Sequence, residues 1–297
     1  MTENILTHDI SLEDIPPKKS QLKETWHRFK KNKLGLYGLI VICVLIVLCA
    51  CAPLVASYEE CITMNVRYKL LTPSWEHPFG TDGYGRDLFA RCLHGGRVSL
   101  LIGLSTSLLS LMAGGLLGLL AGYYGGKVDE ILMRALDILN AIPTILLALA
   151  IVAALGSTIP NMIIALGISR TPAFARVIRA SVLSEADREY VEAAKAGGTS
   201  DFRIMIRHIL PNVAGPMIVQ TTMNVAAMIL QAASMSFLGL GVTAPRPEWG
   251  ALISEAKEFM RAAPHLIAFP GLLIILSASA VSLLGDGLRD ALDPRLK

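Results

Sequence analysis

The sequence is poor in charged residues. Only 17% of its 297 residues are Asp, Glu, Lys or Arg, whereas soluble proteins carry roughly a quarter. Charges are absent from several long runs, and 53% of the chain is hydrophobic. This distribution excludes an ordinary soluble domain and indicates that a lipid bilayer surrounds most of the chain.

Motifs that carry catalysis or bind metals are also missing. Gly126-Lys127 lacks the upstream glycine and the following hydroxyl residue of a phosphate-binding loop, and neither HExxH nor GxSxG occurs. The five cysteines show no zinc-site spacing, and Cys61 and Cys92 are either bridged or two separate thiols. We therefore predict a chain that is not an enzyme and binds no cofactor or metal itself. Its net charge of +3 gives no reason to expect a nucleic-acid partner.

Six apolar stretches are predicted to cross the membrane, since each crossing takes about 20 apolar residues. The run at 138–169 is too long for one helix and breaks at the turn sequence 156–161, so it contributes to two spans. The predicted fold is an all-α integral membrane protein with six transmembrane helices. Its spans lie at 34–56, between Arg97 and Lys127, from near Ile131 to the break, from about Ile159 past Arg170, from Val213 to Phe237, and between Arg261 and Asp286.

Glycines in the second stretch predict a close helix contact. Gly114, Gly118 and Gly122 follow one another at four-residue spacing and therefore share one helix face. Small residues on such a face let a second helix approach closely within a membrane.

The distribution of Lys and Arg predicts the orientation. Most of them lie in the N-terminal tail, in the loop after the fourth span and at the C-terminus, which places both termini in the cytoplasm. The predicted organisation is a cytoplasmic tail at 1–33, the first transmembrane helix at 34–56, an extracellular loop at 57–96, a five-helix core at 97–286 with a cytoplasmic loop at 180–212 and an external loop at 241–264, and a cytoplasmic tail at 287–297.

The cytoplasmic loop is predicted to fold as a helix, a turn and a second helix. A stretch rich in Glu and Ala stops at Gly197-Gly198, which suit a left-handed helix end. One of the three polar residues 199–201 then caps a second, amphipathic helix. Pro211 is expected to separate this helix from the fifth span.

This loop resembles the EAA loop of permeases in binding-protein-dependent ABC importers. The pattern of that loop is EAA, three residues, Gly, nine residues and then I-x-L-P, and His208 departs from it where isoleucine is usual. The coupling loop that the resemblance implies comprises Glu192, Ala193, Ala194, Gly198, Asp201, Leu210 and Pro211.

Further segments resemble one branch of these importers, the dipeptide/oligopeptide/nickel permeases. They lie at 77–87, 236–241, 247–250 and 285–294, and with the loop they extend the resemblance over about residues 26–297. It implies a first span packed outside a five-helix core of the type I importer permease fold. It also implies a bacterial inner (plasma) membrane location.

The resemblance further implies an assembly. The partners are membrane lipid, a second related permease forming a heterodimer, two ATPase subunits that bind ATP and Mg, and an extracellular solute-binding protein. The coupling loop then docks into a groove on the ATPase. Dipeptides, longer peptides, glutathione-like compounds and metal chelates all remain open as substrates.

Two alternatives belong to other classes. An ion-coupled secondary transporter or a channel acting without an ATPase is expected to carry acidic residues within its spans. Here Asp137 and Asp286 lie only at span ends. A membrane-anchored enzyme or scaffold should show a sizeable soluble domain, and the sequence shows no such signature.

Polar residues within two spans are candidates for the translocation pathway. Arg170 falls about 16 Å along the fourth span, where it either faces the pathway or extends toward the cytoplasm. The fifth span carries a polar stripe on one helical face, and this stripe lines either a pathway or a helix interface. The stripe consists of Gln220, Asn224, Gln231 and Ser234.

Two external segments have competing interpretations. His77, Asp82, Arg86 and Asp87 form either a metal or substrate site, or, as the glycines among them favour, a turned loop held by carboxylate–arginine hydrogen bonds. In the second segment Pro247, Glu248 and Trp249 are candidates for docking the binding protein, the alternative being Trp249 in the aromatic belt of the bilayer.

Overall fold

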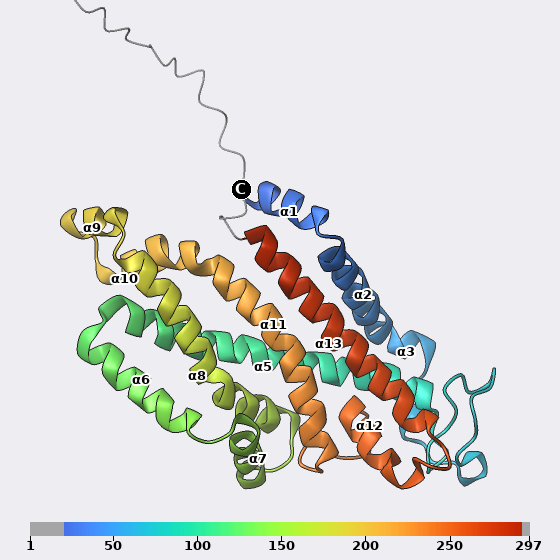
Figure 1. Cartoon of the computed structure of the whole chain (residues 1–297). Helices are drawn as coiled ribbons and strands as arrows, with labels where there is room; N and C mark the ends of the chain where they lie inside the picture. The colour runs from blue at the N-terminus through green and yellow to red at the C-terminus, as the bar shows by residue number, and fades with distance from the viewer. Residues whose placement is uncertain (1–20, 293–297) are drawn as a thin grey trace, which may run out of the picture.

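The computed structural model describes residues 21–292 as a bundle of helices (Figure 1). These residues contain no strand, only an isolated bridge between Thr81 and Asp87, so the all-α prediction is confirmed. The α-helices are α1 Gln21–Lys31, α2 Lys33–Ala50, α3 Ala52–Val55, α4 Tyr58–Ile62, α5 Leu88–Tyr124, α6 Gly126–Asn140, α7 Thr144–Leu155, α8 Ile159–Ala186, α9 Glu189–Ala196, α10 Asp201–Ile204, α11 Leu210–Phe237, α12 Trp249–Ala256 and α13 His265–Leu292.

Four helices of the described part are long and apolar enough to cross a membrane: α2, α5, the continuous segment 201–237 that ends in α11, and α13. The bent pair α6 and α7 supplies a fifth span if it crosses as one unit. Helix α8 is 28 residues long and contains several arginines, which lower its hydropathy. The count of six is compatible with this arrangement if α8 is included, and it stays a prediction.

The third predicted span is broken in its middle. Helices α6 and α7 are bent by 81°, and Pro143 stands immediately before α7. Proline disfavours a helical conformation of the residue before it, which accounts for the break. Ion pairs hold the charged part of α6 against α8, from Arg179 to Asp129 and from Arg176 to Asp137 (2.7 Å).

Helices α5 and α8 make the most extensive contact in the bundle. A Cβ at Gly118 would lie 2.5 Å from the carbonyl oxygen of Ala175, and one at Gly122 would lie 2.8 Å from the Cβ of Val182. No larger residue fits at either position without moving the backbone of α8. The predicted glycine-mediated helix contact is confirmed.

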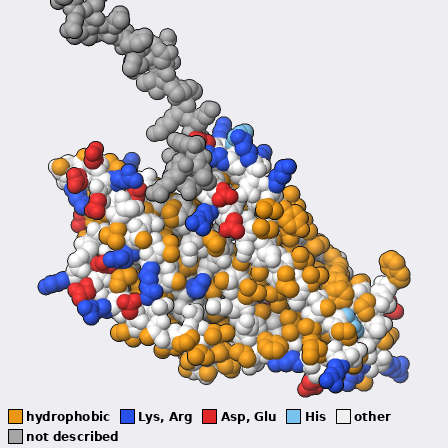
Figure 2. Space-filling model, viewed as in Figure 1, with side chains coloured by type: hydrophobic (Ala, Val, Ile, Leu, Met, Phe, Trp, Pro, Cys, Tyr) orange, Lys and Arg blue, Asp and Glu red, His pale blue; other side chains and the backbone are white. Residues whose placement is uncertain are grey.

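Helix α2 lies at the side of the bundle and packs mainly on α13 (Figure 1). Figure 2 shows hydrophobic side chains over this side and charged side chains toward the two ends of the molecule. Helices α1, α9 and α10 and the end of α13 lie at one end, and α12 lies toward the other (Figure 1). Helix α13 continues through Asp286 to Leu292, so the boundary expected at 286 falls inside a helix, and residues 1–20 and 293–297 lie outside the described residues.

Candidate coupling loop and polar pathway

The loop at 180–212 forms a helix, a turn and a second helix. Helix α9 ends at Ala196 with Gly197 as its C-cap residue, and Gly198 adopts a φ of 74°, the left-handed conformation predicted for this turn. Ser200 is the N-terminal cap residue of α10. Helices α9 and α10, which carry the first part of the EAA pattern, therefore form a short stub beyond the end of the bundle (Figure 1).

The prediction that Pro211 separates this stub from the fifth span is wrong. Helix α10 continues through a π-helical turn, Met205–Ile209, directly into α11. Pro211 is the second residue of α11 and directly follows the π-helical turn, so the helix passes the proline without ending there. The stub and the span thus form one continuous helical segment.

A small hydrophobic core fixes the stub to the bundle. Val191, Ile204 and Ile209 are fully buried and belong to one cluster with Ile178 and Val182 of α8. Burial of each such side chain contributes about 1.5–3 kcal/mol. The stub is therefore packed directly against α8 and α11.

Hydrogen bonds add to this attachment. The hydroxyl of Tyr123 on α5 donates to Oδ1 of Asp201 (2.7 Å). The hydroxyl of Tyr190 donates to Oε2 of Glu185 (2.7 Å) and accepts from Nδ2 of Asn212 (3.1 Å). Burial and the hydrogen bond to the Glu185 carboxylate raise the pKa of Tyr190, so this hydroxyl keeps its proton and remains a donor.

The outer surface of the stub combines small, acidic and apolar residues. Glu192, Ala193 and Gly198 are exposed and Ala194 is half-buried; at the start of α11, Leu210 is half-buried and Pro211 is exposed. Phe202 is 72% exposed. Sequence reasoning did not select Phe202, although an aromatic residue two positions after a helix cap in a polar loop is the signal that would have found it.

Arg170 and Asn224 form the centre of a polar network between three helices. Nε of Arg170 donates to Oδ1 of Asn224 (2.8 Å), and Nδ2 of Asn224 donates to the Ser107 hydroxyl (3.2 Å). Ser107 in turn donates to the carbonyl oxygen of Gly103 (2.9 Å). The network joins α8, α11 and α5, and Ser107 is a member that the sequence did not reveal.

The other residues of the polar stripe have different surroundings. Ser234 is exposed and donates to the carbonyl oxygen of Leu230 (2.8 Å), while Gln231 is half-buried. Gln220 lines a cavity of about 500 Å³ between α8, α11 and α13. The stripe therefore does not have a single environment. Asn224 lies in a helix interface, whereas Gln220 faces the cavity, as a pathway residue would. The lining residues are Val177, Gly215, Pro216, Val219, Gln220, Met223, Arg289 and Leu292.

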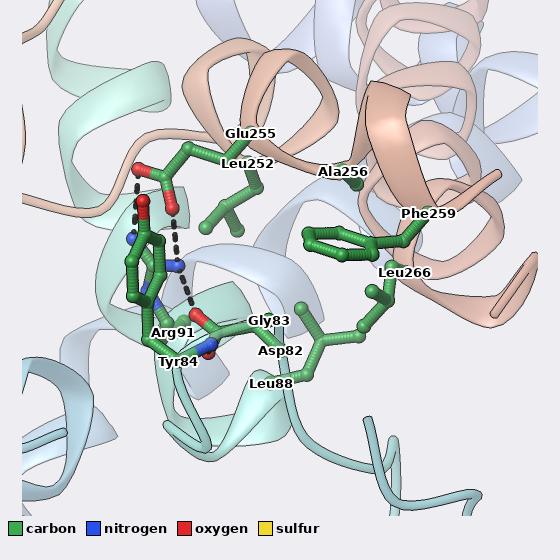
Figure 3. A pocket seen from close by; sticks show the side chains of 10 residues that line it. All are labelled: Asp82, Gly83, Tyr84, Leu88, Arg91, Leu252, Glu255, Ala256, Phe259 and Leu266. Carbon is green, nitrogen blue, oxygen red and sulfur yellow. Dashed lines mark hydrogen bonds and ion pairs between the residues drawn. The ribbon is translucent and has the colours of Figure 1, made fainter. Parts of the chain in front are cut away.

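At the opposite end of the bundle, Asp82 and Glu255 form an ion network with Arg86 and Arg91. Figure 3 shows Asp82, Arg91 and Glu255 of this network. Oδ2 of Asp82 accepts from Nε of Arg86 (2.7 Å) and Nη1 of Arg91 (2.6 Å). Oε2 of Glu255 on α12 accepts from Nη2 of Arg86 (2.5 Å) and Nη1 of Arg91 (2.8 Å). The interpretation of this segment as a loop held by carboxylate–arginine hydrogen bonds is confirmed.

Contacts of His77 and Asp87 lie beside this ion network. Nδ1 of His77 lies 2.8 Å from Oδ2 of Asp87, whose Oδ1 caps α5 by accepting from the backbone N–H of Ala90 (2.7 Å). No disulfide joins Cys61 to Cys92 within the described part of the chain.

The proposed docking residues of the second external segment are buried. Pro247 is buried, and Glu248 and Trp249 are completely buried, so these side chains offer little surface to a partner. The Ser99 hydroxyl donates to Oε1 of Glu248 (2.8 Å), and the Trp249 indole N–H donates to the carbonyl oxygen of Cys92 (2.9 Å). Direct docking through these three side chains is therefore wrong, and so is the alternative of Trp249 in the aromatic belt. They pack α12 against α5.

Two family models match the chain, one in its C-terminal part and one near its N-terminus. The model described as "Binding-protein-dependent transport system inner membrane component" matches residues 114–297. The model described as "N-terminal TM domain of oligopeptide transport permease C" matches residues 20–73.

Curated relatives match nearly the full length. A dipeptide transport system permease protein of Alkalihalophilus pseudofirmus is 45% identical over 94% of this chain and 91% of its own. A di/tripeptide transport system permease protein of Pseudomonas aeruginosa is 47% identical over 94% and 93%. A glutathione transport system permease protein of Pectobacterium atrosepticum is 43% identical over 93% and 91%.

A solved structure shares the fold. An inward-facing structure of the MetNI methionine ABC transporter matches with a TM-score of 0.57 at 17% identity, covering 68% of this chain and 96% of that one. The similarity supports the type I importer permease fold that the sequence predicted.

Proposed function

The chain belongs to the family of inner membrane components of binding-protein-dependent transport systems, and on that premise we propose that it forms, with a second related permease, the translocation path of an ATP-driven peptide importer. It is a multi-pass permease subunit and not an enzyme. Two ATPase subunits supply the energy and hold ATP and Mg, and this chain binds neither.

One observation carries the coupling role. The stub formed by α9 and α10 exposes Glu192, Ala193 and Phe202 while its inner side is built into the core of α8 and α11. Such a stub converts movement of a docked ATPase into movement of two core helices, because interior packing transmits strain. A loosely attached loop would absorb the same movement.

Small peptides are the proposed substrates. The relatives are named for dipeptide, di/tripeptide and glutathione transport. Arg170 stays charged at any physiological pH, and its position beside Asn224 suits transient pairing with a substrate carboxylate during passage. Gln220 and the cavity that it lines lie farther along α11 toward the stub.

The proposed orientation places both termini and the stub in the cytoplasm of a bacterial cell, at its inner (plasma) membrane. Lys and Arg are concentrated at that end, in agreement with the positive-inside tendency. The solute-binding protein then docks at the end that carries α12, where residues 243–246 of the external loop are exposed.

Reconstitution tests this function. The chain is purified with its co-encoded subunits, placed in proteoliposomes with the binding protein, and assayed for uptake of a labelled dipeptide. We expect uptake that requires ATP and all subunits. Uptake by this chain alone, driven by an ion gradient, would support the ion-coupled alternative instead.

A further inference from the structure

Helix α1 is held in a fixed position at the end of the bundle where α13 ends. Phe29 is buried where Gly35 of α2 crosses Gly287 of α13. Asn32 accepts from the backbone N–H of Gly35 (2.9 Å) and donates from Nδ2 to Oδ2 of Asp290 (2.9 Å). These contacts fix both the position of α1 and its rotation about its own axis.

The connection between α1 and α2 changes the direction of the chain. Asn32 has an extended conformation, with φ −82° and ψ 98°, so α1 leaves the axis of α2, as Figure 1 shows. Helix α2 begins one residue later at Lys33 and is apolar and uncharged from Leu34 to Ala50. Helix α1 therefore lies next to the level at which the chain enters the membrane.

The outward face of α1 is cationic and has an aromatic edge. Lys23, Trp26 and Lys30 share this face and are exposed, Trp26 to 48%. The Trp26 ring stacks on Phe29 with 5.7 Å between centroids, and Nζ of Lys30 lies 5.3 Å from the centre of the Trp26 ring. The acidic residue of α1, Glu24, is paired with Arg28 and does not neutralise the two lysines.

We propose that α1 binds the anionic phospholipid headgroups of the membrane leaflet on the side of the termini. Lys23 and Lys30 contact lipid phosphates, and Trp26 enters the headgroup layer between them. Charge complementarity and the direct continuity with an apolar span favour a lipid surface as the occupant. The proposal uses the family's membrane location, and it relies on the proposed orientation only to name the leaflet as cytoplasmic.

Hydrogen exchange of the intact chain in nanodiscs tests this proposal. Both leaflets of a disc have the same composition, so the result does not depend on the orientation or on coupling to an ATPase. Discs of phosphatidylcholine alone are compared with discs that also contain phosphatidylglycerol. We expect the amides of α1 to exchange about tenfold more slowly with the anionic lipid, because two lysines contribute at the surface, and we expect high salt to remove the difference.

Matched variants make the result specific. Lys23→Gln with Lys30→Gln should abolish the difference between the two discs, whereas Lys23→Arg with Lys30→Arg should keep it. Lys127→Gln, a change of an exposed lysine outside α1, should also keep it. Equal protection of α1 in both discs for the wild type would overturn the proposal and leave α1 held by protein contacts alone. Protection that appears only when the second permease is present would assign this face to a protein partner.

Discussion

Nε of Arg170 donates a 2.8 Å hydrogen bond to Oδ1 of Asn224, which joins α8 to the polar stripe of α11. A guanidinium does not lose its proton in a protein, so within a membrane it requires water, a carboxylate or amide and carbonyl oxygens. Asn224 meets this requirement in part, and it is held in turn by Ser107. Arg170 is therefore held in a defined position by its Nε, and its other guanidinium N–H groups are left to bind a substrate.

Arg170 is expected to act on substrates that carry a free carboxylate. Arg170→Met should lower kcat/KM for dipeptide uptake about tenfold, the size of one lost charge-assisted hydrogen bond, and should leave uptake of the matching peptide amide unchanged. Uptake of both compounds into proteoliposomes measures this, with Arg170→Lys as the charge-preserving control. An equal loss for both substrates would mean that Arg170 supports the structure, and no change would remove it from the pathway.

Gly198 is expected to be required for coupling. Its φ of 74° is unfavourable for a β-branched residue by about 1–2 kcal/mol, so Gly198→Val should distort the stub and uncouple the ATPase. The measurement is binding-protein-stimulated ATP hydrolysis at equal amounts of assembled complex. Gly197→Ala is the matched control, because Gly197 has a φ of −76° and space for a Cβ. Normal stimulation of ATP hydrolysis in Gly198→Val would show that the loop only connects two helices and takes no part in coupling.

Phe202 is expected to contact the ATPase subunit. Because its side chain is exposed, Phe202→Ser should leave the thermal stability of the isolated permease unchanged and reduce co-purification of the ATPase severalfold. Ile204→Ser, at a fully buried position two residues away, should instead lower the unfolding temperature. Full retention of the ATPase by Phe202→Ser would exclude this residue from the interface.

The buried ion network is expected to stabilise the end of the bundle that carries α12. Asp82→Asn leaves Arg86 and Arg91 without one of their two carboxylate partners, and breaking such a buried pair costs about 3–5 kcal/mol. Thermal unfolding in detergent should therefore begin at a markedly lower temperature. Glu258→Gln, at an exposed position nearby, should have no effect. Equal stability of both variants would contradict the inferred anchor.

The orientation is expected to follow the basic residues. Ser74→Cys and Arg246→Cys, both at exposed positions, should react with a membrane-impermeant thiol reagent added to intact cells. Ser200→Cys should react only after the membrane is opened. The parent chain, whose own five cysteines remain, sets the background. Labelling of Ser200→Cys from outside would reverse the proposed topology.

The sequence by itself determined the all-α fold, the close glycine contact on α5 and the left-handed turn at Gly198. Each of these depends on local properties: the length of an apolar run, a four-residue spacing, or the backbone freedom of one residue. The carboxylate–arginine interpretation of residues 82–87 came from the same kind of information. It did not include Glu255, because Arg86 and Glu255 are separated by 169 positions in the chain.

Only the tertiary structure decided which side chains are buried and which residues meet across helices. It buried Trp249 against α5, where the sequence placed an exposed docking residue, and it carried α10 through a π-helical turn past Pro211. It also brought Asn224 to Arg170 and Ser107. A side chain's exposure and partners depend on which helices pack together and at what rotation, and hydropathy and spacing, which report on single helices, do not contain that information.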